Sequence, residues 1–170
     1  VAADGTEFRM EDVAGLSAAD FPELTTESFP YTPVVNPADA DVKVPALFND
    51  VRYYHNRGDS TWAGESETLG DFVGLDDLMT EHPDVVAEFV EVYKNWIDLG
   101  VDGFRIDTAK HVNFEFWEQW TPQIVDHAQQ VRGDDDFFMF GEVYSSDTRI
   151  LSPYVRDTEM SSVLDFAFQE

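Results

Sequence analysis

Residues 103–111, with the sequence GFRIDTAKH, are expected to form a strand that ends in a cluster of charged side chains. Successive side chains of an extended segment face opposite ways, so Arg105 and Asp107 share one face while Phe104 and Ile106 pack on the other. A charged pair at the end of an apolar strand is typical of an active-site floor. It also fits a structural ion pair, or an Asp that caps the next helix. The rest of the chain has to decide between these interpretations.

The composition indicates a folded, acidic protein. The 170 residues suffice for an ordinary domain, and 43% hydrophobic residues with 14% aromatics exclude a disordered chain. A net charge of -25 argues against nucleic acid and against an anionic membrane surface as partners, although it also fits a salty habitat or simple solubility. The chain has no cysteine, and therefore no disulfide or thiolate metal site. Neither end resembles a targeting segment, and no apolar run of about 18 residues exists to span a bilayer.

The pattern of apolar and polar residues changes near residue 80. Residues 1–80 carry scattered prolines and aromatics without sustained periodicity, which predicts loop-rich structure with short extended pieces around residues 21–29 and 42–48. From residue 82 onward, apolar residues recur at regular spacings. They predict helices over residues 83–99, 113–132 and 147–155, and strands over residues 101–107, 137–144 and 162–168. Asn113 is expected to cap the second helix, and Gly133 to end it.

The alternation of helices and strands predicts an α/β fold with parallel strands. Because crossovers between parallel strands are right-handed, the carboxyl ends of the strands gather on one rim, where such folds bind their ligands. Asp107 ends the first strand and Glu142 ends the second. We therefore expect these two carboxylates to be neighbours in space.

Two carboxylates in different surroundings can divide the work of a hydrolase. Glu142 shares a face with Phe138 and Phe140, and an apolar environment raises a carboxyl pKa, which suits a general acid. Arg105 beside Asp107 would keep that group ionised, which suits a nucleophile. Retaining glycosidases hold such a pair about 5 to 5.5 Å apart, which is compatible with strands about 4.8 Å apart. A Mg²⁺ or Ca²⁺ site and structural ion pairs fit the same pattern.

Three segments resemble motifs of the alpha-amylase family of (β/α)8 barrel α-glucan hydrolases. Residues 103–111 are similar to the segment that carries the nucleophile, and residues 140–143, FGEV, to the acid/base segment. Residues 74–78, GLDDL, resemble the short motif near the end of the loop domain inserted after the third barrel strand. All three occur in the family's order.

The resemblance assigns a role to each matching residue. It implies that Asp107 is the nucleophile, that Glu142 is the acid and base, and that Arg105 holds Asp107 ionised. Lys110 and His111 match positions that contact glucose units. The His111 carbonyl and the Asp77 side chain match ligands of a structural Ca²⁺. Taken without the resemblance, Lys110 also fits a solvated surface charge, His111 a polar residue at a helix start, and Asp77 a turn or cap residue.

Several other residues are weaker candidates. Tyr53, Tyr54 and Trp62 are interpreted either as platforms that stack on sugar rings or as core residues. Glu65 is more readily a surface residue than a Ca²⁺ ligand. His55 shows no metal-ligand spacing.

The sequence also departs from the family. It contains neither the Asn-His pair nor the His-Asp pair of complete members, so the third catalytic acid is absent. A closed barrel needs roughly 250 residues. We therefore expect an internal fragment, with an inserted loop-rich domain over residues 1–80 and part of the barrel, about strands four to six, over residues 81–170. Alone it should be inactive, and it should need the rest of the catalytic domain as a partner.

The resemblance implies an extracellular α-amylase that cleaves α-1,4 bonds of starch or glycogen. Pullulan-cleaving or glucosyl-transferring members of the family are the nearest alternatives. A non-catalytic relative that binds glucan or a partner protein is a further alternative, against which the presence of both Asp107 and Glu142 argues.

Overall fold

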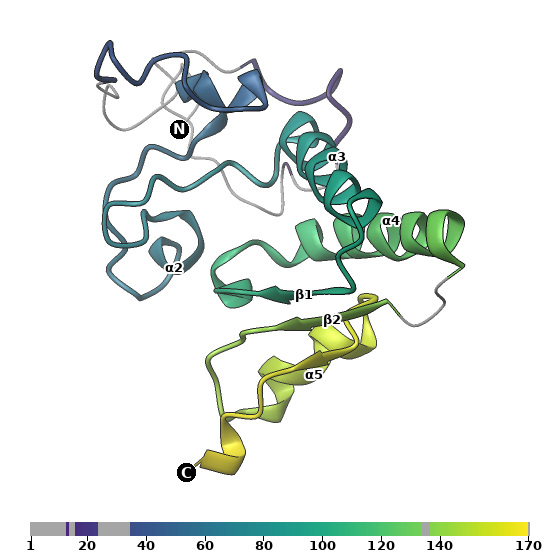
Figure 1. Cartoon of the computed structure of the whole chain (residues 1–170). Helices are drawn as coiled ribbons and strands as arrows, with labels where there is room; N and C mark the ends of the chain where they lie inside the picture. Colours follow the sequence, from purple (N-terminus) through teal and green to yellow (C-terminus); the bar gives the residue numbers. More distant parts are fainter. Residues whose placement is uncertain (1–12, 14–15, 24–34, 134–136, 170) are drawn as a thin grey trace. The chain divides into compact units, whose positions relative to one another are not determined.

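The computed structural model describes residues 13, 16–23, 35–133 and 137–169. Internal contacts divide the chain into two compact units, Val1–Glu88 and Phe89–Glu170, called unit 1 and unit 2 below (Figure 1). The domain boundary expected at residues 80 and 81 stays a prediction. In the described part of the chain, every helix is too short or too polar to cross a membrane.

Unit 2 is built on a parallel sheet of three strands. The strands are β1 (Gly103–Ile106), β2 (Phe138–Gly141) and β3 (Ser162–Val163), and they lie in the order β1-β2-β3. Gly103 pairs with Phe138 and Ile106 with Gly141, while Gly141 also pairs with Val163. The predicted parallel pairing is confirmed. The sheet places the ends of β1 and β2 side by side.

The third strand is much shorter than the expected residues 162–168. β2 ends at Gly141, whose carbonyl accepts a hydrogen bond from the Leu164 N–H at 3.0 Å. Past that point the described part of β2 offers no further ladder partner, and the chain turns into the short 3-10 helix η5 (Ala167–Gln169). The sequence pattern predicted extended structure up to residue 168. A strand ends, however, where its backbone no longer has a neighbouring strand to pair with.

Two glycines allow the strands to approach closely. A Cβ on Gly103 would lie 2.4 Å from the Phe138 carbonyl oxygen, and one on Gly141 would lie 2.8 Å from the Met160 sulfur. Any other residue at either position would force a shift. The glycines that open β1 and close β2 are therefore part of what sets the strand register next to the paired carboxylates.

The helices agree closely with the sequence pattern. They are α3 (Pro83–Asp98), α4 (Phe114–Arg132) and α5 (Thr148–Arg156). Gly133 ends α4 with a left-handed φ of 64°, as expected for a glycine after a helix. Asn113 does occupy the N-cap position of α4, but its side chain makes no capping hydrogen bond. Asp147 is the capping side chain that the sequence pattern missed, since it accepts from the Arg149 N–H.

Aromatic rings fill the space between β1 and the helices in unit 2. The Phe104 ring lies 5.1 Å from that of Tyr93 on α3 and 5.2 Å from that of Phe137. On α4 the Trp117 and Trp120 rings are buried and lie 5.9 Å apart at nearly right angles. This core holds one face of β1, which leaves Arg105 on the other face.

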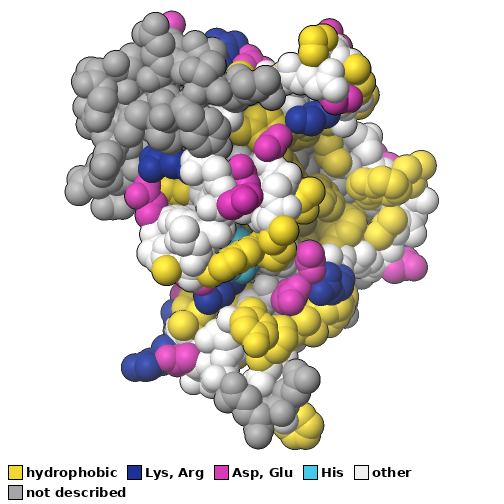
Figure 2. Space-filling view, turned by 90° about the vertical axis from the view of Figure 1, so that its left-hand side faces the viewer, with side chains coloured by type: hydrophobic (Ala, Val, Ile, Leu, Met, Phe, Trp, Pro, Cys, Tyr) yellow, Lys and Arg dark blue, Asp and Glu magenta, His cyan; other side chains and the backbone are white. Residues whose placement is uncertain are grey.

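Between residues 35 and 82, the described part of unit 1 consists mainly of loops and short helices. These are the 3-10 helices η2 (Ala46–Asn49) and η3 (Val51–Tyr53) and the helix α2 (Ser66–Leu69). The extended piece expected around residues 42–48 is wrong at its end, since η2 begins there at Ala46. Much of the piece expected at residues 21–29 lies outside the described residues. On the face drawn in Figure 2, hydrophobic side chains are exposed in patches bordered by charged ones.

Candidate active site

The structure brings Asp107 and Glu142 together through one arginine. Arg105 contacts the Asp107 carboxylate at 2.5 Å and the Glu142 carboxylate at 2.9 Å. The strand pairing explains this, because the Glu142 N–H donates to the Ile106 carbonyl at 2.7 Å and so continues the ladder past β2. All three side chains are at the carboxyl ends of adjacent parallel strands, where α/β folds place their ligands.

The electrostatics of this cluster favour an ionised Asp107. A hydrogen bond with the Glu142 carboxyl and a second one with the Arg105 guanidinium lower the pKa of Asp107 below its ordinary value. Asp107 is 64% exposed and Arg105 49% exposed, so their ion pair is screened by water and adds little stability. A charged group that is held ionised, oriented and accessible is suited to attack or to stabilise a positive centre.

Glu142 sits in a different environment from Asp107. Its carboxylate is only 27% exposed. Glu142 directly follows β2, on which the Phe138 and Phe140 rings lie 5.8 Å apart. The two carboxyls thus differ in exposure although one arginine binds both. Such a pair can supply a nucleophile together with a proton donor, and paired acids of this kind also suit a cation.

The turn after β1 carries Lys110 and His111. Thr108 adopts a left-handed φ of 50°, and the 3-10 helix η4 (Ala109–His111) follows. The Trp117 indole N–H donates to the buried Ala109 carbonyl at 3.0 Å, which ties this turn to α4. Lys110 and His111 are both half-buried in the turn, within four residues of Asp107. The sequence pattern gave no indication of this contact of Trp117, because apolar spacing alone predicts only that the residue is buried.

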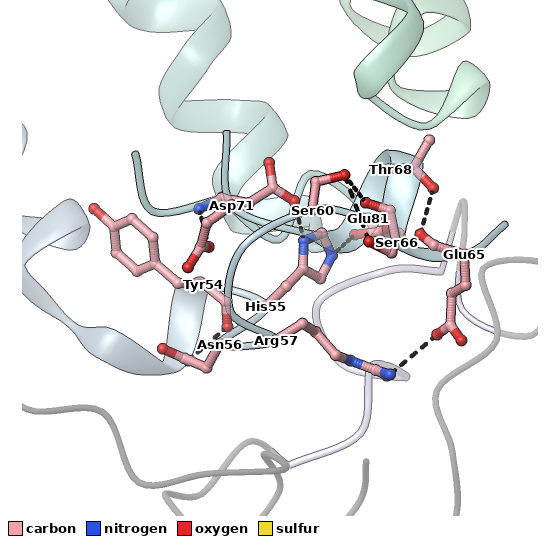
Figure 3. Close-up of polar contacts among 11 residues, drawn as sticks. Tyr54, His55, Asn56, Arg57, Ser60, Glu65, Ser66, Thr68, Asp71 and Glu81 are labelled. Carbon is pink, nitrogen blue, oxygen red and sulfur yellow. Dashed lines mark hydrogen bonds and ion pairs between the residues drawn. The ribbon is translucent and has the colours of Figure 1, made fainter. Parts of the chain in front are cut away.

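Asp77 belongs to a charged cluster around the buried His55 in unit 1 that the sequence did not reveal. Its carboxylate lies 2.6 Å from Nδ1 of His55, and Glu81 lies 2.7 Å from Nε2 of the same ring (Figure 3 shows His55 and Glu81). Burial alone lowers the pKa of His55, but the charge of Glu81 and the hydrogen bonds of both carboxylates outweigh it and raise that pKa to about 10. His55 is therefore a buried imidazolium between two carboxylates.

A cluster of acidic and imidazole side chains that could hold calcium is not found among the described residues. No group of three His, Asp or Glu side chains in the described part of the chain is arranged to hold a metal ion. The Asp77 carboxylate is already compensated by His55, and Glu65 pairs with Arg57 at 3.1 Å (Figure 3). The roles expected of Asp77 and His111 as calcium ligands stay a prediction.

The three aromatic candidates of unit 1 have different surroundings. Tyr54 is buried, and its hydroxyl donates to the Phe48 carbonyl at 2.7 Å. Tyr53 packs edge-on against His82 at 4.9 Å. Trp62, by contrast, is 46% exposed. The core interpretation therefore fits Tyr54, whereas Trp62 stays accessible.

Comparisons with known proteins find a family model, curated relatives and solved structures that match this chain. Residues 31–170 match the family model described as the alpha amylase catalytic domain. An alpha-amylase of Streptomyces lividans is 52% identical over 98% of this chain, which covers 18% of that protein. A cyclomaltodextrin glucanotransferase of Klebsiella oxytoca is 31% identical over 69% of the chain, which covers 19% of it. A crystal structure of an Anoxybacillus alpha-amylase superposes with a TM-score of 0.59 and 33% identity over 68% of the chain, or 25% of its own length. The chain thus spans less than a fifth of these two curated relatives.

Proposed function

This chain belongs to the alpha-amylase catalytic-domain family, and we propose that the protein of which it is part is a retaining α-glucan hydrolase that cleaves α-1,4 bonds of starch or glycogen. The observation that carries the proposal is Arg105, which binds Asp107 and Glu142 at the ends of two adjacent parallel strands. The sheet and helices of unit 2 are a partial α/β piece of this family's (β/α)8 barrel.

The proposed mechanism assigns one chemical task to each carboxyl. Asp107 attacks the anomeric carbon of the bound glucose unit while Glu142 donates a proton to the departing glycosidic oxygen, so that a covalent glycosyl ester forms. Glu142, now a carboxylate, takes a proton from water. The water oxygen then attacks the anomeric carbon and releases Asp107. Each attack inverts the configuration at the anomeric carbon, so the two steps together retain it.

The other site residues act by orientation and binding. Arg105 keeps Asp107 ionised and turned toward the substrate, consistent with the lowered pKa of Asp107. We assign Lys110 and His111, on the turn after β1, to contacts with glucose units of the substrate. The third acid of the family has no counterpart in this sequence, so we expect the 170-residue chain alone to release no reducing ends from starch.

Substitution of each carboxyl in the full-length protein tests the proposal. Asp107→Asn and Glu142→Gln should each reduce starch hydrolysis by more than about a thousandfold. Asp157→Asn is the matched control, because Asp157 is also an exposed Asp bound to an Arg. NMR of the first product should show the α-anomer. Appearance of the β-anomer first, or full activity of Asp107→Asn, would contradict the mechanism.

A glucosyl-transferring activity is the second candidate, supported by the similarity to the cyclomaltodextrin glucanotransferase. Both reactions share the covalent intermediate and differ in whether water or a sugar hydroxyl attacks it. Product analysis on starch, pullulan and sucrose separates the two and also detects a pullulan-cleaving member. A protein that binds starch but releases no product from any of the three would be the non-catalytic relative.

Calcium and location are further proposals. Calcium is supported by the family, many of whose members bind it, and by the match of Asp77 and the His111 carbonyl to ligand positions. Removal of calcium with a chelator should lower the melting temperature of the full-length protein, and Asp77→Asn should abolish that dependence. We also propose an extracellular location, as the family resemblance implies, with starch supplied from outside the cell as the substrate. Amylase activity confined to washed cells would contradict this placement.

A further inference from the structure

His82 accepts all the hydrogen bonds that the free amide groups in the first turn of α3 donate. The helix begins at Pro83, which has no N–H, so the three amide groups that follow it are the free ones. The N–H of Asp84 donates to Nδ1 of the His82 ring at 3.1 Å. The N–H groups of Val85 and Val86 both donate to the His82 carbonyl, at 3.0 and 3.1 Å. His82 is therefore the N-cap residue of α3, and its imidazole takes the place that an Asn or Asp side chain usually has there.

This cap fixes the protonation state of the His82 ring. A backbone N–H can only donate, so Nδ1 is the unprotonated nitrogen and Nε2 carries the single proton of a neutral imidazole. A doubly protonated ring would turn an N–H toward the N–H of Asp84, and it would place a positive charge at the positive end of the helix dipole. The capping hydrogen bond therefore exists only while His82 is neutral.

The surroundings of His82 favour the neutral ring. His82 is buried, and the rings of Phe21 and Tyr53 lie 4.3 and 4.9 Å from its own. The charged group that faces it from α3 is the Asp84 carboxylate, 4.0 Å from Nδ1. From η3 the Tyr53 hydroxyl donates to that carboxylate at 3.5 Å. Burial lowers the pKa of His82 by more than the charge of Asp84 raises it, so the net shift is downward from 6.5.

We propose that His82 is an acid-sensitive cap, whose neutral ring holds the first turn of α3 and whose protonation releases that turn in acidic solution. Val85 and Val86 of this turn are buried, so its release exposes apolar side chains to water. The folded state binds a proton on His82 less readily than the unfolded state does. The stabilisation by the cap is therefore complete above about pH 6.5 and is lost as the pH falls below that value. This role is independent of the reaction that the full-length protein catalyses.

Amide hydrogen exchange in the full-length protein tests the cap. Protection of a peptide that covers residues 80–90 is measured at pH 7.5 and pH 5, after correction for the intrinsic pH dependence of exchange. In the wild type the protection factor should fall by about tenfold between the two, as expected for the loss of a helix cap. His82→Asn keeps a capping acceptor that does not titrate, so its protection factor should change by no more than about twofold. His127→Asn is the matched control, because His127 lies inside α4 and pairs with the exposed Asp98, and it should show the wild-type fall.

A second measurement reads the ring itself. Nitrogen-15 NMR of the wild-type protein labelled at histidine, with the His82→Asn spectrum for assignment, should show an unprotonated Nδ1 at pH 7.5 and protonation with a midpoint below pH 6.5. The proposal is overturned if protection of residues 80–90 falls equally in the wild type and in His82→Asn, or if Nδ1 of His82 carries the proton at pH 7.5. A tenfold loss of protection in His82→Asn already at pH 7.5 would also overturn it, since the ring would then act by packing and not as an acceptor.

Discussion

Replacement of His55 by Gln should destabilise unit 1 strongly at neutral pH. The ring is buried between Asp77 and Glu81, so the variant leaves two carboxylates without their cation. A pKa raised from 6.5 to about 10 corresponds to about 5 kcal/mol at 1.36 kcal/mol per unit. Burial raises the pKa of Asp77, which offsets part of this amount. We therefore expect the free energy of unfolding to fall by about 3 to 5 kcal/mol at pH 6.

The sign of the pH dependence follows from the raised pKa of His55. The folded state binds the proton more tightly than the unfolded state, so the stabilisation is complete below about pH 6.5 and is lost as the pH rises toward 10. The free energy of unfolding is measured at pH 6 and pH 9.5 by urea unfolding of the full-length protein. Pulse proteolysis reports the unfolding, with cleavage mapped to residues 53–82. The difference between wild type and His55→Gln should shrink over that range.

A matched control exists in unit 2. His127 lies 2.8 Å from Asp98, a distance like those at His55, but Asp98 is 51% exposed. His127→Gln should therefore cost no more than about 1 kcal/mol. Equal costs for the two variants, or a cost at His55 that is the same at pH 6 and pH 9.5, would refute the reasoning.

The other predictions concern the neighbourhood of the paired carboxylates. Arg105→Gln should raise the pKa of Asp107 and so move the acidic limb of the kcat/KM profile to higher pH, and an unmoved limb would show that Arg105 does not set that pKa. Gly103→Ala should destabilise the full-length protein by about 2 to 4 kcal/mol and by more than Gly141→Ala, as measured by urea unfolding, because the first Cβ meets a backbone carbonyl and the second a flexible thioether. Trp117→Phe removes the hydrogen bond to the turn after β1 and should cost about 1 kcal/mol together with a fall in kcat; an unchanged kcat would mean that this bond does not position the site.

The sequence predicted unit 2 better than unit 1 for physical reasons. Helical and strand periodicity follow from packing against one face, and α3, α4 and the pairing of β1 with β2 came out nearly as expected. The end of β3 could not be predicted, because it depends on a partner strand far away in the sequence. Loops in unit 1 have no such period. The conformation of these loops depends on single polar contacts, such as the hydrogen bond between Ser60 and Ser66. Sequence periodicity does not predict contacts of this kind.

The same limit explains why one charged cluster was found and the other was missed. The two clusters share one arrangement, a cation held between two carboxylates. In unit 2 the cation is Arg105, and in unit 1 it is His55. The first follows from strand register, whereas the residues of the second are joined only by tertiary folding. Burial then separates their roles. Water screens the Arg105 cluster, which leaves its charges free to act on a substrate, while desolvation makes the His55 cluster costly to open and therefore structural.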